Sequence, residues 1–197
     1  LIGLGIGYLL FLATGKSSSN LSVSPSPAVS VPTASLPSES ATPTEVGKEM
    51  DLLKVALTAA DLIKTGSYDK LSEMVHSEDG VYFIPYSYID LSTDMHFTAD
   101  QVANFATDET TYLWGYTDGE GAPINLTPKQ YFEKYVYDED YITAPVIGRN
   151  YIVKTANSIE NVQDVFPDCQ FVDFHFPGFD AQVGGLAWST LRLVFRE

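Results

Sequence analysis

The stretch from Ser17 to Gly47 constrains this chain most, because its composition does not support a folded core. It contains ten Ser, three Thr and five Pro among 31 residues, and no aromatic residue. Such a segment buries too little apolar surface to offset the conformational entropy lost on folding, and its prolines exclude long helices. We therefore expect residues 16–47 to be a disordered linker between an apolar start, residues 1–15, and one globular domain, residues 48–197.

The apolar start has no charged residue from Leu1 to Thr14. A helix of that length rises about 21 Å, less than the ~30 Å hydrocarbon core of a bilayer. Two interpretations fit: a truncated transmembrane or signal-anchor helix, or the apolar region of a cleaved signal peptide. A buried core helix is a third, although the linker that follows offers nothing to cover it. We expect the anchor, and so a single-pass protein of the cell membrane with an extracytoplasmic domain.

The 150 residues from 48 to 197 hold most of the charged and aromatic side chains. The whole chain has 26 acidic and 11 basic residues, a net charge of −15. This balance argues against nucleic-acid binding, because phosphates require clustered Lys and Arg. A single cysteine excludes an intramolecular disulfide and a cysteine-rich zinc site, and none follows the apolar start to carry a lipid. The last residues resemble the interior of a strand, so we expect the domain to be truncated at its C-terminus.

Local patterns predict helices in the first half of this domain. One apolar stripe at helical spacing consists of Leu52, Val55, Ala56, Ala59, Leu62 and Ile63. Gly66 is a good helix stop, and a short second helix is expected after Ser67. Capping-box patterns that start at Thr98 and at Thr127 predict two further helical segments.

Strands are predicted mainly in the second half. Residues 81–90 are rich in β-formers but contain Pro85, which predicts an edge strand or two short strands. Residues 110–127 are typical of a β-hairpin, with Tyr112, Trp114 and Tyr116 on one face. Residues 170–176 and 187–197 are expected to be neighbouring antiparallel strands. Because the helices precede the strands instead of alternating with them, the sequence predicts an α+β fold.

Asp173 and His175 are the residues that most suggest chemistry. They lie two apart in an expected strand, so they project from one face about 6.6 Å apart along it. In an apolar pocket they could form a general acid/base pair, but a solvated polar sheet face is the simpler interpretation. His76, His96 and Cys169 have no spacing that indicates a metal site or an activated thiol. We therefore predict no catalytic residue, no metal and no cofactor.

Aromatic residues could line a ligand pocket, since their rings combine apolar area with a polar group. Tyr86, Trp114 and Tyr116 are the candidates of this kind, although packing between strands explains them equally well. Together with Asp173 and His175 they make up the predicted ligand-pocket residues.

Several separate segments of the domain resemble an extracytoplasmic bacterial domain of uncharacterised role. They are GVYFIPYSYID, TYLWGYTDGEGAPINLT, YFEKYVYDEDY, FVDFHFPGFD and WSTLRLVF. That family occurs in lipoproteins and membrane-anchored proteins of Gram-positive bacteria. The resemblance covers roughly residues 48–197 and implies a cone-shaped fold of the nuclear-transport-factor-like (cystatin-like) type, with a long N-terminal helix across a curved antiparallel sheet. The family offers no established catalytic residues to carry over to this chain. The resemblance also implies a further C-terminal strand, whose absence would leave a sheet edge unpaired.

These observations favour a membrane-tethered, non-enzymatic module for ligand binding or interaction. Its expected partners are the membrane, through the N-terminal helix, and an unknown small molecule or envelope component, but no nucleic acid. The alternative is a small-molecule isomerase or dehydratase with a pocket between helix and sheet, which requires Asp173 and His175 to face that pocket. A structural or regulatory ectodomain is a third hypothesis.

Overall fold

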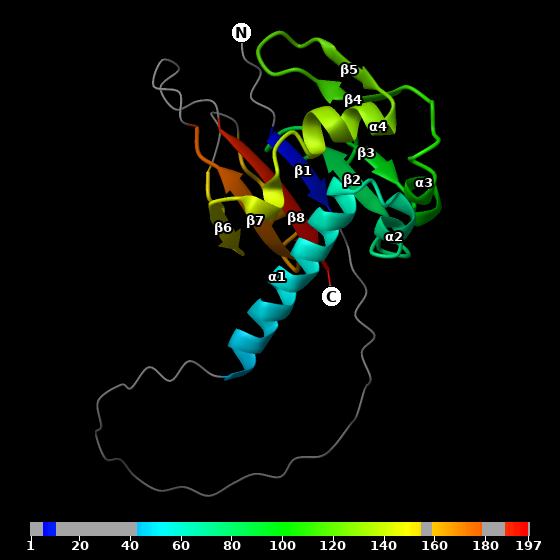
Figure 1. Cartoon of the computed structure of the whole chain (residues 1–197). Helices are drawn as coiled ribbons and strands as arrows, with labels where there is room; N and C mark the ends of the chain where they lie inside the picture. Colours follow the sequence, from blue (N-terminus) through cyan, green and yellow to red (C-terminus); the bar gives the residue numbers. More distant parts are fainter. Residues whose placement is uncertain (1–5, 11–42, 155–158, 179–187, 197) are drawn as a thin grey trace, which may run out of the picture.

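A six-stranded sheet and a separate hairpin form the β-structure of the residues that the computed structural model describes, which are 6–10, 43–154, 159–178 and 188–196 (Figure 1). The large sheet has the order β3-β2-β1-β8-β7-β6. Its strands are β1 (Ile6–Leu10), β2 (Val81–Ile84), β3 (Met95–Phe97), β6 (Val146–Arg149), β7 (Gln170–Phe176) and β8 (Ser189–Phe195). Neighbouring strands are antiparallel except β1 and β8, which are parallel. The hairpin pairs β4 (Tyr112–Tyr116) with β5 (Pro123–Leu126).

One long helix and several short ones complete the fold. They are α1 (Pro43–Lys64), α2 (Tyr68–Ser72), α3 (Ala99–Ala103), α4 (Pro128–Tyr131), the π-helical turn η1 (Phe132–Val136), the 3-10 turn η2 (Tyr141–Thr143) and α5 (Val162–Val165). The strands are mainly antiparallel, and the helices lie among them without the regular alternation of an α/β fold, so the predicted α+β class is confirmed, although the helices do not all precede the strands. The predicted helix that carries the stripe from Leu52 to Ile63 is present, and it begins at Pro43, within the segment expected to be linker.

The expectation of a membrane-spanning helix at residues 1–15 is wrong. Residues 6–10 form β1, which lies between β2 and β8 in the large sheet. Among the residues that the structure describes, no helix has the length and apolar character needed to cross a bilayer. The signal-anchor interpretation and the single-pass membrane location, which depended on such a helix, therefore lose their support. The predicted disordered linker lies mostly outside the described residues.

The two faces of the large sheet are covered by different parts of the chain. Side chains that alternate along β7 and β8 point to opposite faces. Val172, Phe174, Leu191 and Leu193 belong to the main core, in which α1 packs against β7. The opposite face bears Phe171 and Val194, which join a second apolar cluster with Val162 and Phe166 of the α5 region. The sheet is thus buried on both sides, and the polar residues of its second face are buried as well.

Two strand predictions differ from the structure for reasons of local geometry. β2 ends at Ile84, before the proline, and lies inside the sheet rather than at its edge. In the hairpin, the register shifts between Leu113 and Tyr116, and Gly115 has a φ of 143°. Trp114 is consequently buried while Tyr116 is 58% exposed, so the two do not share a buried face. β8 has β1 on one side and β7 on the other, so the expected unpaired edge beside it is absent.

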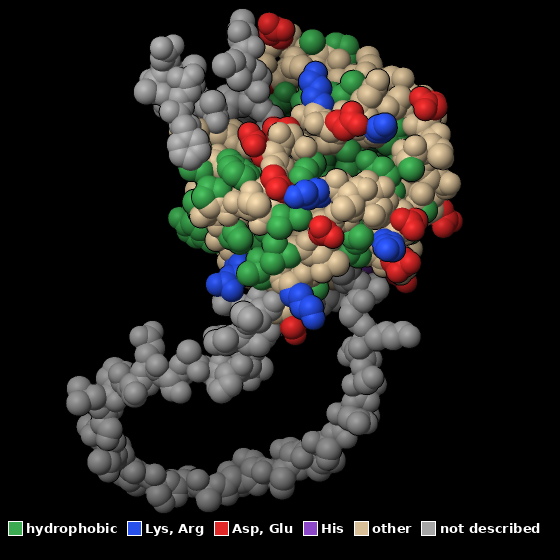
Figure 2. All heavy atoms as spheres, viewed as in Figure 1, with side chains coloured by type: hydrophobic (Ala, Val, Ile, Leu, Met, Phe, Trp, Pro, Cys, Tyr) green, Lys and Arg blue, Asp and Glu red, His purple; other side chains and the backbone are tan. Residues whose placement is uncertain are grey.

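Charged side chains are scattered on the face of the molecule that Figure 2 shows. Acidic side chains outnumber basic ones in the chain, 26 to 11, and on this face both kinds lie among hydrophobic and polar side chains. Lys and Arg do not gather there into a continuous patch.

Candidate functional site

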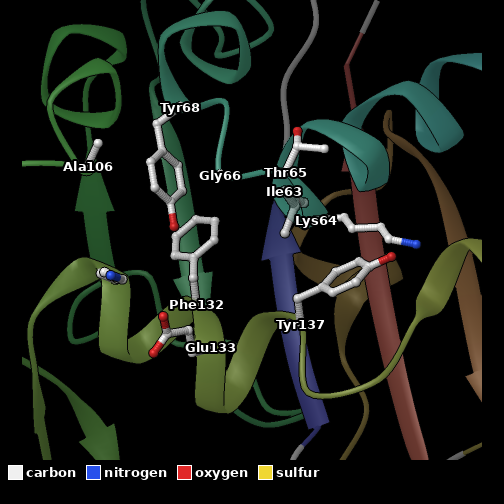
Figure 3. A pocket seen from close by; sticks show the side chains of 10 residues that line it. Ile63, Lys64, Thr65, Gly66, Tyr68, Ala106, Phe132, Glu133 and Tyr137 are labelled. Carbon is white, nitrogen blue, oxygen red and sulfur yellow. The ribbon is translucent and has the colours of Figure 1, made fainter.

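A cavity of about 380 Å³ lies where the end of α1 meets η1 (Figure 3). Its walls are formed by the turn between α1 and α2, by Ala106, and by residues of α4 and η1. The lining residues are Ile63, Lys64, Thr65, Gly66, Tyr68, Ala106, Lys129, Phe132, Glu133 and Tyr137. Its size falls in the range of about 300–1,000 Å³ that is typical of small-molecule sites.

Gly66 shapes one side of the cavity. Its φ of 63° is the left-handed conformation that ends helices at glycine. The amide of Gly66 donates to Ile63 O at 3.1 Å, and that of Ser67 donates to Leu62 O at 2.9 Å, which is the Schellman pattern. The chain therefore reverses within two residues, and Tyr68 follows directly in the cavity wall.

The π-helical turn shapes the other side. α4 begins as predicted, with a complete capping box between Thr127 and Gln130. After Tyr131 the helix widens, and the amide of Tyr137 donates to Phe132 O at 2.8 Å, five residues back. Tyr131 itself is fixed in the core, where its ring stacks on Trp114 with centroids 3.8 Å apart. π-Helical turns are rare and occur frequently at functional sites.

The floor of the cavity is apolar and aromatic. The rings of Tyr68 and Phe132 meet edge to face with centroids 4.9 Å apart, and Figure 3 shows both beside Glu133. Burial, reinforced by the nearby Glu133 charge, raises the pKa of Tyr68 to about 12. Its hydroxyl therefore remains protonated at neutral pH and can act as a hydrogen-bond donor.

The rim of the cavity is charged. Lys64 donates to both carboxylate oxygens of Asp140, at 2.9 and 2.8 Å, and the Tyr137 hydroxyl donates to the same carboxylate at 2.8 Å. These bonds lower the pKa of Asp140. Lys129 and Glu133 lie on the α4–η1 side, and both side chains are exposed. The site thus combines an aromatic floor with charges of both signs.

Asp173 and His175 lie elsewhere, on the face of the sheet opposite α1. Asp173 is fully buried and forms two hydrogen bonds with Arg192, from Nε at 2.6 Å and from Nη2 at 2.8 Å. His175 Nδ1 lies 2.7 Å from the Thr190 hydroxyl. Burial lowers the pKa of His175. Neither side chain faces a cavity beneath α1, so the geometry that the isomerase or dehydratase alternative required is not present.

The three aromatic residues predicted to line a pocket do not come together in one cavity. The Trp114 indole is buried and donates to Leu126 O at 2.8 Å. The Tyr86 hydroxyl accepts a hydrogen bond from the Asp118 amide at 2.9 Å, and Tyr116 is exposed. Trp114 contributes indirectly to the cavity through its stack on Tyr131, but none of the five predicted residues lines it.

A second cavity, of about 320 Å³, lies beside β2 and β3. Its polar groups bond largely to each other: His96 Nε2 lies 2.6 Å from Asp79 O, and Arg196 forms an ion pair with the Asp79 carboxylate. Within the described part of the chain, no group of three or more His, Cys, Asp or Glu is arranged to hold a metal ion. The first cavity is therefore the better candidate for a binding site.

Sequence patterns did indicate parts of the first cavity, although they were not assigned to a site. The helix stop at Gly66 and the capping box at Thr127 predict where its two walls begin. They do not indicate that these walls meet, because Gly66 and Phe132 are 66 residues apart in the chain. Comparison with known proteins adds no assignment: no family model, no curated protein and no solved structure matches this chain.

Proposed function

We propose that this protein is a non-enzymatic binding module whose ligand occupies the cavity between the Gly66 turn and η1. The observation that carries the proposal is a concave, aromatic-floored site with a π-helical turn in its wall. An apolar floor supplies affinity, and a few polar groups at the rim orient the ligand.

We also propose that the fold is of the cone-shaped, nuclear-transport-factor-like type that the sequence segments resemble. The packing of the long helix α1 against one face of the large sheet supports this assignment. The parallel pairing of β1 with β8 departs from a purely antiparallel sheet.

Filling the cavity tests the proposed site. Ala106 is exposed and lines the cavity, so Ala106→Phe should occupy the space without disturbing the core. Indole, benzoate and 2-phenylethylamine serve as neutral, anionic and cationic aromatic probes in ligand-observed NMR with the full chain. At least one should bind, and Ala106→Phe should weaken its binding by about tenfold or more, equivalent to ~1.4 kcal/mol.

Thr107→Phe is the matched control, because Thr107 is also exposed but does not line the cavity. This variant should bind the probe as the original chain does. The proposal would be wrong if no probe bound the original chain, or if Ala106→Phe bound it equally well.

A further inference from the structure

The charges on the α4–η1 wall indicate which class of ligand the proposed site accepts, and this inference rests on the proposed function. Lys129 and Glu133 are four residues apart and both line the cavity. Within the described part of the chain, neither forms an ion pair within 4 Å, whereas Lys64, also at the rim, is paired with Asp140. One positive and one negative group thus remain available on the same wall.

The floor next to these charges is suited to an apolar side chain. Ile63 and Phe132 are buried, and the rings of Tyr68 and Phe132 form an edge-to-face pair. Figure 3 shows Tyr68 and Phe132 next to the Glu133 carboxylate, with Ile63 nearer the α1 side. A ligand that lies on this floor would have its polar end within reach of the charged wall.

We propose that the cavity binds a small zwitterion with an apolar body, of the type of an α-amino acid with an aromatic or branched side chain. Glu133 receives the ammonium group, Lys129 receives the carboxylate, and the side chain lies on Tyr68 and Phe132.

Ligands with a single charge fit this wall less well. A purely anionic ligand meets Lys129 but also the Glu133 carboxylate and the net charge of −15 of the whole chain. A purely cationic ligand is attracted by the net charge and by Glu133, but it also meets the Lys129 ammonium group on the same wall. Only a ligand with both charges satisfies Lys129 and Glu133 together.

Three probes of similar size separate these cases: L-phenylalanine, 2-phenylethylamine and 3-phenylpropionate. Dissociation constants are measured by NMR titration with the full chain at pH 7 and low salt. We expect L-phenylalanine to bind about fivefold more tightly than either single-charge probe, because each exposed charge pair contributes on that scale.

Two charge variants should give a crossed pattern. Lys129→Gln should weaken L-phenylalanine and 3-phenylpropionate by about fivefold and leave 2-phenylethylamine unchanged or tighter. Glu133→Gln should weaken L-phenylalanine and 2-phenylethylamine to a similar extent and spare 3-phenylpropionate. Lys134→Gln and Glu139→Gln are matched controls, since both residues are exposed neighbours outside the cavity lining, and neither should change the order of affinities.

The outcomes distinguish this inference from the proposed function. If the three probes bind equally and the charge variants have no effect, while Ala106→Phe still blocks binding, the zwitterion assignment is overturned and the binding site remains. If Ala106→Phe does not weaken any probe, the site itself is overturned. The crossed pattern together with the block by Ala106→Phe supports both.

Discussion

Asp94 and Tyr131 are polar residues that the fold places in largely apolar surroundings. The Tyr131 ring is fully buried, and its hydroxyl finds no hydrogen-bond partner among the residues that the structure describes. Burial raises the pKa of Tyr131 well above its usual value, and the nearby Tyr135 and Asp94 reinforce the shift. Burial also raises the pKa of Asp94 to about 6, although its Oδ2 accepts a hydrogen bond from the Asp90 amide at 2.7 Å. Burial of such groups reduces stability, because the polar atoms lose water without full compensation by hydrogen bonds.

The raised pKa of Asp94 predicts a pH-dependent effect of Asp94→Asn. A carboxyl whose pKa is higher in the folded state, about 6, than in the unfolded chain favours folding at low pH, and this contribution is lost as the pH rises from ~4 to ~6. Asparagine can still accept the bond from the Asp90 amide but carries no charge. We expect Asp94→Asn to raise the melting temperature by about 2–4 °C at pH 8, the equivalent of ~1 kcal/mol after allowance for partial exposure.

At pH 4, where Asp94 is largely protonated, the variant should melt within about 1 °C of the original chain. Asp90→Asn is the control from the same loop. Bonds from the Ser92 hydroxyl and amide to Asp90 lower its pKa, so removal of this charge should reduce stability at neutral pH. Equal effects of Asp94→Asn at pH 4 and pH 8 would show that desolvation of the charge is not the cause.

At the scale of elements, the sequence predicts those parts whose causes are local. The stripe on α1, the stop at Gly66 and the capping boxes each depend on residues that are close in sequence, within about three turns of helix at most, and the structure contains all of them. The π-helical form of η1 was not predictable in this way. It coincides with the tertiary packing of Tyr131 between Trp114 and Tyr135. The strand at residues 6–10 was not predicted, because a continuous apolar run has no periodicity that distinguishes a membrane helix from a buried strand.

Gly80 ends the turn at residues 76–80 and immediately precedes β2. Its backbone lies very close to β3. A Cβ at Gly80 would lie 2.5 Å from His96 Nε2 and 2.5 Å from Phe97 O, at a φ of 64°. Gly80→Ala must therefore displace the β3 backbone as well as strain its own. We expect it to lower the free energy of unfolding by about 2–4 kcal/mol in urea denaturation.

Gly119 offers a control at a similar backbone angle. Its φ is 78°, but a Cβ there would meet no atom within 4 Å. Gly119→Ala should lose only the backbone contribution of about 1–2 kcal/mol. If the two variants lost equal stability, the close approach of Gly80 to β3 would contribute nothing.

At the scale of the whole molecule, the second face of the large sheet is covered by chain that comes from between β6 and β7. This segment between β6 and β7 (the cover) is joined to the sheet by a cluster of buried charged side chains. Asp173 lies directly opposite Arg192 in the β7–β8 register, and Arg192 Nη1 donates to Glu160 Oε2 at 2.6 Å. The Val153 amide donates to Asp173 Oδ2 at 3.1 Å. The polar pattern of β7 thus belongs to an interface between two layers of the domain, whereas the sequence favoured a solvated face.

This arrangement predicts that Arg192→Met releases the cover from the sheet. The substitution leaves the Asp173 carboxylate buried without its guanidinium, and the loss of one partner of a buried ion pair costs about 3–5 kcal/mol. Urea denaturation should show a loss of that size, and hydrogen exchange should accelerate at the Val153 amide more than at amides in α1. In the double variant Asp173→Leu with Arg192→Met, no carboxylate remains unpaired in the sheet, so it should lose less stability than Arg192→Met alone. If instead the losses of Asp173→Leu and Arg192→Met simply added in the double variant, the two residues would not act as a coupled pair.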